Sequence, residues 1–127
     1  MSGEDAGPGY SAKRGASRLR LRLPAHAITH QGNARVVLCD ISLGGAKVFA
    51  RADLPVGRDI VLKWDRFDAF GTKVWEREGL RGVQFDEPVP APVLIATRDL
   101  QDAGGLNREQ VGEWVAEKGW NFGKAVS

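Results

Sequence analysis

The sequence has a single cysteine, no long apolar run and almost no net charge, and each shortage narrows the class of protein. Cys39 stands alone among 127 residues, so a disulfide framework is excluded, and no secretory leader opens the chain. No apolar stretch approaches the ~20 residues that a helix needs to cross a bilayer. We therefore expect a soluble protein of the cytoplasm that does not enter the membrane.

Signatures of catalysis and of metal binding are missing as well. The sequence contains no nucleophile elbow, no Walker loop and no Cys–His pair at a recognisable spacing. His26 and His30, with the distant Cys39, would make a poor zinc site. We expect a protein that is not an enzyme and that carries neither a metal nor a cofactor.

The net charge of +2 conceals an uneven distribution along the chain. Residues 1–40 carry six basic and three acidic side chains, net +3, and the remaining residues carry twelve basic and thirteen acidic ones, net −1. All six early basic residues lie between Lys13 and Arg35, with no acid among them. This pattern is typical of a site for a small polyanion, although a solvated basic face is the commoner origin of such a run.

The composition divides the chain into three parts, and 43% apolar residues suffice for one globular core. Residues 1–12 are rich in Gly, Ser and Pro and have no apolar periodicity, which predicts a flexible tail. We expect a barrel over residues 13–88 and a helical extension, packed on the barrel, over residues 89–127.

Alternating residues predict short strands. In residues 18–23 leucine and arginine alternate, so Leu19, Leu21 and Leu23 should face a core and the arginines solvent. A second strand over residues 35–42 should turn Val37, Cys39 and Ile41 inward and leave Asp40 and Ser42 outside. Further strands are expected over residues 46–50, 59–64, 72–77 and 82–85. This spacing indicates a mainly β fold, a small antiparallel barrel of six or seven strands.

Two helices should follow the strands. Pro90 suits the beginning of a helix that Gly104 would end. Asn107, with Gln110 three residues later, predicts the capped start of a second helix that ends near Gly119.

Two short motifs stand out beside this pattern: Arg14-x-x-x-Arg18, and Asp40-x-Ser42-x-x-Gly45. Together and in this order they resemble the signature of the PilZ domain family. The resemblance covers about residues 13–87 and implies a PilZ-type β-barrel. It also implies that the ligand is the bacterial second messenger cyclic di-GMP.

The chemistry of these residues suits that ligand. The guanidinium groups of Arg14 and Arg18 can each fork two hydrogen bonds to a phosphate or to guanine O6 and N7, and can stack on a purine. Asp40 can accept from the N1–H and amino group of guanine, and the Ser42 hydroxyl can add a contact. Gly45 would let the backbone approach the ligand.

The resemblance implies further contacts. Family members often bind the messenger as an intercalated dimer, and Trp75 is placed where an aromatic ring can meet a guanine. Lys13 precedes Arg14 where many members have a second arginine, and we include Lys13 among the ligand-binding candidates. Arg20 and Arg22 share the basic face as weaker candidates.

Each residue also has a purely structural interpretation. Asp40 could hold the following turn, Gly45 could mark a bulge, and Trp75 could belong to the barrel core. At the level of function, the leading hypothesis is a cyclic di-GMP receptor that signals to a protein effector in motility, exopolysaccharide or adhesion control. The alternatives are a PilZ-like interaction scaffold that binds no nucleotide and, well behind it, a small RNA-binding barrel.

A switch is expected next to the first strand. Residues 11–17 contain no large apolar side chain, so ligand contacts from Lys13, Arg14 and Arg18 would be needed to offset the entropy of ordering them. We therefore predict that this segment is mobile without ligand and ordered with it.

Overall fold

The computed structural model describes residues 18–51, 54 and 59–116, and these form six strands and two helices. The strands are β1 (Leu19–Thr29), β2 (Gly32–Ile41), β3 (Gly45–Phe49), β4 (Asp59–Trp64), β5 (Phe67–Arg77) and β6 (Leu80–Phe85). The helices are α1 (Ala91–Gly104) and α2 (Arg108–Ala116). The predicted tail over residues 1–12 lies outside the described residues.

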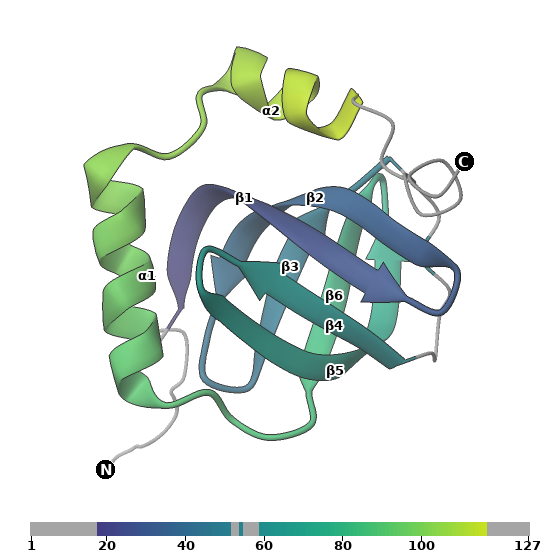
Figure 1. Ribbon diagram of the computed structural model, residues 1–127, viewed down its shortest axis with the longest axis horizontal. Coiled ribbons are helices and arrows are strands. Elements are labelled where there is room, and N and C mark those ends of the chain that lie inside the picture. Colours follow the sequence, from purple (N-terminus) through teal and green to yellow (C-terminus); the bar gives the residue numbers. More distant parts are fainter. Residues whose placement is uncertain (1–17, 52–53, 55–58, 117–127) are drawn as a thin grey trace, which may run out of the picture.

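The strands close an antiparallel barrel in the order β1-β2-β3-β6-β5-β4 (Figure 1). Closure occurs because β1 pairs with β2 through most of its length and with β4 at His26, Ala27 and Ile28. Between β3 and β4, the described residue Leu54 is buried in the core. The predicted fold class, a small antiparallel β-barrel followed by C-terminal helices, is confirmed.

The alternation in β1 produces its two faces. Leu21 and Leu23 are each 6% exposed inside the barrel, whereas Arg20 and Arg22 point into solvent. Each buried leucine contributes about 1.5–3 kcal/mol relative to an exposed one, and this burial fixes the register of the strand. The predicted outward face of arginines is therefore present.

The predicted inward face of β2 was wrong. Val36 and Leu38 enter the core, while Val37 is buried on the outer face and Cys39 is half-buried. The register against β3 shifts between Leu38 and Asp40, so Cys39 forms a β-bulge. This extra residue reverses the alternation, and Ile41 therefore faces inward as predicted.

Several strands are longer than predicted. β5 begins at Phe67, directly after a turn at Asp65 and Arg66 that the sequence analysis did not find. Asp65 adopts a φ of 51°, which aspartate tolerates better than most residues. The first hairpin turn lies at His30 and Gln31, whereas residues 31–33 were expected to form it because their residue types favour turns.

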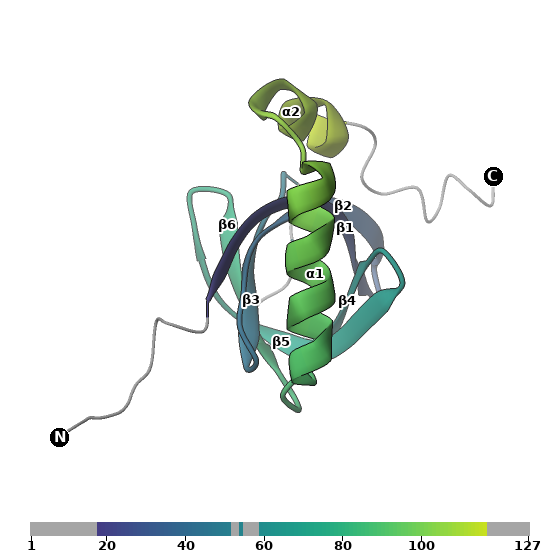
Figure 2. The ribbon, with the colours of Figure 1, turned by 90° about the vertical axis from the view of Figure 1, so that its left-hand side faces the viewer.

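Helix α1 lies across the end of the barrel at which β4 ends (Figure 2). Thr97 is fully buried, accepts a 3.0 Å hydrogen bond from Trp64 Nε1 and donates a 2.7 Å bond to Val93 O. Pro90 and Gly105 flank the helix, in agreement with the predicted boundaries. The helix therefore completes the core instead of standing apart from it.

Helix α2 packs on the outer wall of β1 and β2. Asn107 and Gln110 exchange two bonds of 2.8 and 2.9 Å, which confirms the predicted capping box. The Trp114 indole donates a 2.7 Å bond to Val36 O and meets the His26 ring edge-on. The predicted end near Gly119 lies outside the described residues. Neither helix in the described part of the chain has the length and apolar content of a membrane span.

Candidate functional site

The second motif forms the turn between β2 and β3. The Ser42 amide donates a 2.8 Å bond to Gly45 O, and the Ser42 hydroxyl lies 3.4 Å from the same oxygen. The backbone therefore closes this turn, with a weak contribution from the serine side chain. Asp40 makes no hydrogen bond to the turn, so the interpretation of Asp40 as its holder finds no support among the described contacts.

The tip of this turn is fixed to the end of the neighbouring strand β6 and to the segment after it. Phe85 N donates a 2.9 Å bond to Gly44 O, and Val89 N donates a 2.9 Å bond to Leu43 O. The turn is thus held on both sides, by its own hairpin and by the segment that follows β6. A ligand that contacts the turn would meet a backbone that is already ordered.

The packing of the barrel itself requires a glycine at position 45. A Cβ at this position would lie 2.6 Å from Val83 O on the neighbouring strand, which is closer than a real Cβ atom comes. Gly45 therefore permits the close pairing of β3 with β6. This role requires no ligand, and the approach of a ligand to Gly45 stays a prediction.

Asp40 and Arg18 form the centre of the site. Arg18 Nε lies 3.2 Å from Asp40 Oδ1; the Asp40 side chain is 9% exposed and that of Arg18 is 57% exposed. The geometry is that of an ion pair without a hydrogen bond, and Asp40 Oδ1 has no hydrogen-bond partner among the described residues. The Arg18 charge compensates the carboxylate, and Asp40 Oδ1 keeps the capacity to accept a hydrogen bond from a further donor, such as one on a ligand.

Asp40 belongs to a row of residues that crosses five strands on the outer wall. Arg20 lies opposite Asp40, Asp40 opposite Lys47, Lys47 opposite Gly82, and Gly82 opposite Trp75. Residues directly opposite in antiparallel strands share a face and lie about 4.5–5.5 Å apart. The row therefore joins the Arg18–Asp40 pair to the tryptophan across one continuous surface.

Trp75 ends this row with its ring against a glycine. A Cβ on Gly82 would lie 2.0 Å from Trp75 Nε1, so the indole rests directly on the Gly82 backbone. The residue is 43% exposed and faces solvent, which excludes the interpretation of Trp75 as barrel core. Its orientation leaves part of an aromatic ring open to a partner.

Three strand irregularities lie near this surface. The register shifts at residues 21–22 of β1, at Cys39 of β2 and at Val74 of β5. Bulges re-aim neighbouring side chains and increase local twist, and they are frequent beside binding sites. Here they lie beside Arg20, Asp40 and Trp75, three residues of this row.

The thiol of Cys39, next to Asp40 in the chain, is free and half-buried. Burial raises its pKa, with Lys47 acting in the opposite direction, so the neutral thiol is favoured. Within residues 18–51, 54 and 59–116, no group of three His, Cys, Asp or Glu side chains is placed to hold a metal ion. What the outer wall offers is recognition by charge, hydrogen bonding and stacking.

A second set of charges lies inside the barrel and has a structural role. Lys73 is 2% exposed and donates to Leu54 O and to Glu76, and Arg81, 3% exposed, donates to Ala50 O. The hydrogen bond from Lys73 and then the charge of Arg81 lower the pKa of Glu76. These contacts tie Ala50 and Leu54, which lie between β3 and β4, to β5 and β6.

The structure brings together part of the predicted site. Arg18 and Asp40 form a pair and Trp75 shares their face, whereas Lys13 and Arg14 lie outside the described residues. Lys47 was not predicted, although its outward position in a strand next to Asp40 was available from the alternation. Lys47 is half-buried, and in the strand register it lies between Asp40 of β2 and Gly82 of β6, the residue opposite Trp75.

These features define a small closed antiparallel barrel with an arginine–aspartate pair and an exposed tryptophan on its outer wall. The family model described as PilZ domain matches residues 12–98, and the chain belongs to the PilZ domain family. The matched range extends past the barrel into α1. No curated protein sequence matches the chain.

Two solved structures show similarity to the fold. PlzA of Borreliella burgdorferi, in complex with c-di-GMP, gives a TM-score of 0.54 at 17% identity, covering 71% of this chain. This chain spans only 41% of PlzA, and the likeness shows the fold alone. An uncharacterized protein of Legionella gives a TM-score of 0.44 at 16% identity, covers 68% of this chain and 95% of its own, and carries no argument.

Proposed function

We propose that this protein is a cyclic di-GMP receptor that binds the messenger on the outer barrel wall at Asp40. The observation that carries the proposal is the buried Asp40 oxygen, which lies beside Arg18 and has no hydrogen-bond partner among the described residues. Membership of the PilZ family supports it, as does the structural similarity to PlzA, a protein solved with c-di-GMP.

The ligand would complete the contacts that the described residues leave open. The N1–H and amino group of guanine would donate to Asp40, which offers an acceptor and a negative charge. The Arg18 guanidinium is more than half exposed, so it can turn toward a phosphate or toward guanine O6 and N7. Arg14, Lys13 and the Ser42 hydroxyl are the remaining proposed contacts.

The opposite end of the row suits a second base or phosphate. The exposed ring of Trp75 can stack on guanine, which is worth about 1–3 kcal/mol per base at comparable single-stranded sites. Lys47 stands between Asp40 and Trp75, where its ammonium can neutralise a phosphate. Asp40 and Trp75, the two proposed sites of base contact, are separated by three strand spacings. This separation favours the intercalated dimer of the messenger over a single molecule.

Signalling is the second part of the proposal. Ligand contacts from Lys13, Arg14 and Arg18 would order residues 11–17 against the Asp40–Gly45 turn and create a composite surface. A protein effector in motility, exopolysaccharide or adhesion control would recognise that surface. The protein would act as a receptor and adaptor in the cytoplasm, with no catalytic activity of its own.

Calorimetric titration of the full chain with cyclic di-GMP tests the binding step. Saturable heat is expected for the natural sequence and for Asp102→Ala, a control at an exposed acid on α1. Asp40→Ala should lose at least ~10-fold in affinity, and Asp40→Asn should lose less because the amide keeps one acceptor. No heat from the correctly folded natural sequence would favour the scaffold that binds no nucleotide.

A further inference from the structure

A second surface, which the nucleotide does not explain, lies on the wall formed by β4 and β5. Ile28 of β1 lies opposite Val61 of β4, and Val61 lies opposite Phe70 of β5. All three alternate with buried residues and face outward, and Phe70 is 62% exposed. We call this row, together with its acidic border described below, the Phe70 surface.

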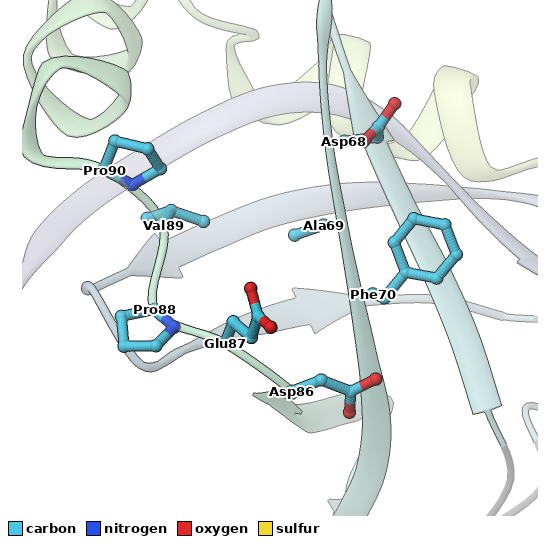
Figure 3. A pocket seen from close by; sticks show the side chains of 8 residues that line it. All are labelled: Asp68, Ala69, Phe70, Asp86, Glu87, Pro88, Val89 and Pro90. Atoms are coloured by element: carbon cyan, nitrogen blue, oxygen red, sulfur yellow. The ribbon is translucent and has the colours of Figure 1, made fainter.

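Two hollows flank the Phe70 ring. One, of about 430 Å³, is lined by Phe70, by Ala69 and by the segment after β6, as Figure 3 shows. The other, of about 390 Å³, is lined by Ile28, Val61 and Phe70 among others. A large aromatic side chain that projects between two recesses can be gripped by side chains of a partner on both sides.

The border of this surface is acidic. Asp68, Asp86 and Glu87 line the first hollow, and Asp59 and Asp86 line the second. None of these four carboxylates has an ion pair among the described residues, although Lys63 lies opposite Asp68 in the strand register. The surface thus combines an exposed apolar centre with unpaired negative charge.

No residue of α1 or α2 lines either hollow, and a backbone hydrogen bond anchors the wall. Helix α1 packs mainly on β1 and α2 on β1 and β2, and Trp114 of α2 comes near Ile28 at the edge of the surface. Asp86 N donates a 2.9 Å bond to Phe70 O, which fixes the wall of the first hollow. A surface that is held in place before binding saves a partner part of the ordering cost.

We propose that the Phe70 surface docks a protein segment that presents an apolar side chain flanked by lysine or arginine. The apolar side chain would pack against Phe70 between the hollows, and the basic side chains would meet Asp59, Asp68, Asp86 and Glu87. This inference goes beyond the proposed nucleotide binding and does not depend on it.

Charge selects this class of partner. Nucleic acids and anionic membranes would be repelled by these four carboxylates, which have no ion pair within the part of the chain that the structure describes. A second copy of this chain on a two-fold axis would place the same acidic border against itself, because such an interface uses one patch twice. A basic and apolar protein segment meets neither obstacle.

Panning a phage library of random peptides against the immobilised full chain tests the proposal. Enriched peptides should combine Lys or Arg with an aliphatic or aromatic residue, and their affinity should fall as salt rises. Phe70→Ser should lower the affinity of a synthetic enriched peptide at least ~10-fold, as expected for an aromatic anchor. A triple Asp68→Asn, Asp86→Asn, Glu87→Gln variant should weaken binding and flatten its salt dependence.

The matched control is Ile95→Ser, which changes another exposed apolar residue, 52% exposed on α1, and should leave peptide binding intact. Absence of any enriched peptide, or enriched peptides that bind Phe70→Ser equally well, would overturn the proposal. So would a dimer in sedimentation that Phe70→Ser abolishes, because the occupant would then be a second copy. Peptide binding is measured without nucleotide, so a chain that fails to bind cyclic di-GMP leaves this test unaffected.

Discussion

Arg18 Nε and Asp40 Oδ1 lie 3.2 Å apart where the beginning of β1 meets the end of β2. The aspartate side chain is buried, while most of the arginine side chain is exposed. An ion pair of this kind, open to solvent on one side, contributes about 0–1 kcal/mol to stability. The pair is therefore a minor element of the fold. In the proposed function, the pair would keep a carboxylate and a guanidinium together where a guanine nucleotide could bind both.

Arg18→Ala should abolish cyclic di-GMP binding and leave the barrel folded. Arg18 faces solvent, and its loss leaves Leu21 and Leu23 packed, whereas a charged hydrogen bond to the ligand is worth ~1.5–3 kcal/mol, or at least tenfold in affinity. Calorimetry and circular dichroism of the same sample measure the two effects. Unchanged affinity in a folded variant would reject Arg18 as a ligand contact.

Gly82→Ala should displace the Trp75 ring and leave the side chains of Arg18, Asp40 and Ser42 unchanged. The new methyl group would overlap the indole, at a cost of roughly 1–3 kcal/mol in stability, and ligand affinity should fall by about tenfold as stacking is lost. Thermal unfolding and titration provide both numbers. Gly112→Ala on α2, where a Cβ meets nothing within 4 Å, serves as the control. Equal affinity in Gly82→Ala would remove Trp75 from the site.

The packing of α2 should weaken in acid because of His26. Burial, with the positive charges of Arg35 and Lys63 nearby, lowers the pKa of this histidine below its usual 6.5, and the ring touches Trp114. The folded state therefore binds fewer protons than the unfolded state. Its stability is complete above about pH 6.5 and falls as the pH drops below that value.

Denaturant unfolding between pH 7.5 and 5.5, monitored by tryptophan fluorescence, measures this dependence. His26→Gln should flatten the pH dependence over this interval. His30→Gln, which changes an exposed histidine in the β1–β2 turn, should keep it. A His26→Gln variant with the full slope would assign the effect to another group.

Residues 11–17 should become protected from hydrogen exchange when cyclic di-GMP binds. This stretch has no large apolar side chain, so its ordering depends on contacts from Lys13, Arg14 and Arg18 with the ligand. Exchange measured with and without ligand tests the proposed switch. Protection already present in the free protein, or absent from the saturated complex, would place the switch elsewhere.

The local sequence pattern predicted much of the fold. The predictions failed where the structure depends on pairing between residues that are distant in sequence. The alternation of β1 and the capping box at Asn107 depend on nearby residues and are present as predicted. The bulge at Cys39 depends on the register against β3, so its reversal of the inward face could not be derived from β2 alone. The docking of Trp114 on Val36 O depends on contacts distant in sequence.

The candidate site likewise contains residues that the sequence motifs predicted and one that only the strand pairing reveals. The two motifs led to Arg18 and Asp40, which the structure pairs, but motif spacing said nothing of Lys47. That residue joins the site only because β3 pairs with β2 on one side and with β6 on the other. The Trp75 ring could be assigned to the outer wall only once the bulge in β5 was known.

Amide and indole chemical-shift mapping of the full chain during titration with cyclic di-GMP tests the central claim most directly. Shifts should concentrate at Arg18, at the Asp40–Gly45 turn, at Lys47 and Gly82, and at the Trp75 indole N–H, and the Phe70 surface should stay unperturbed. Saturable shifts confined to Phe70 and the hollows beside it, or no shifts at all, would contradict binding at the outer-wall row.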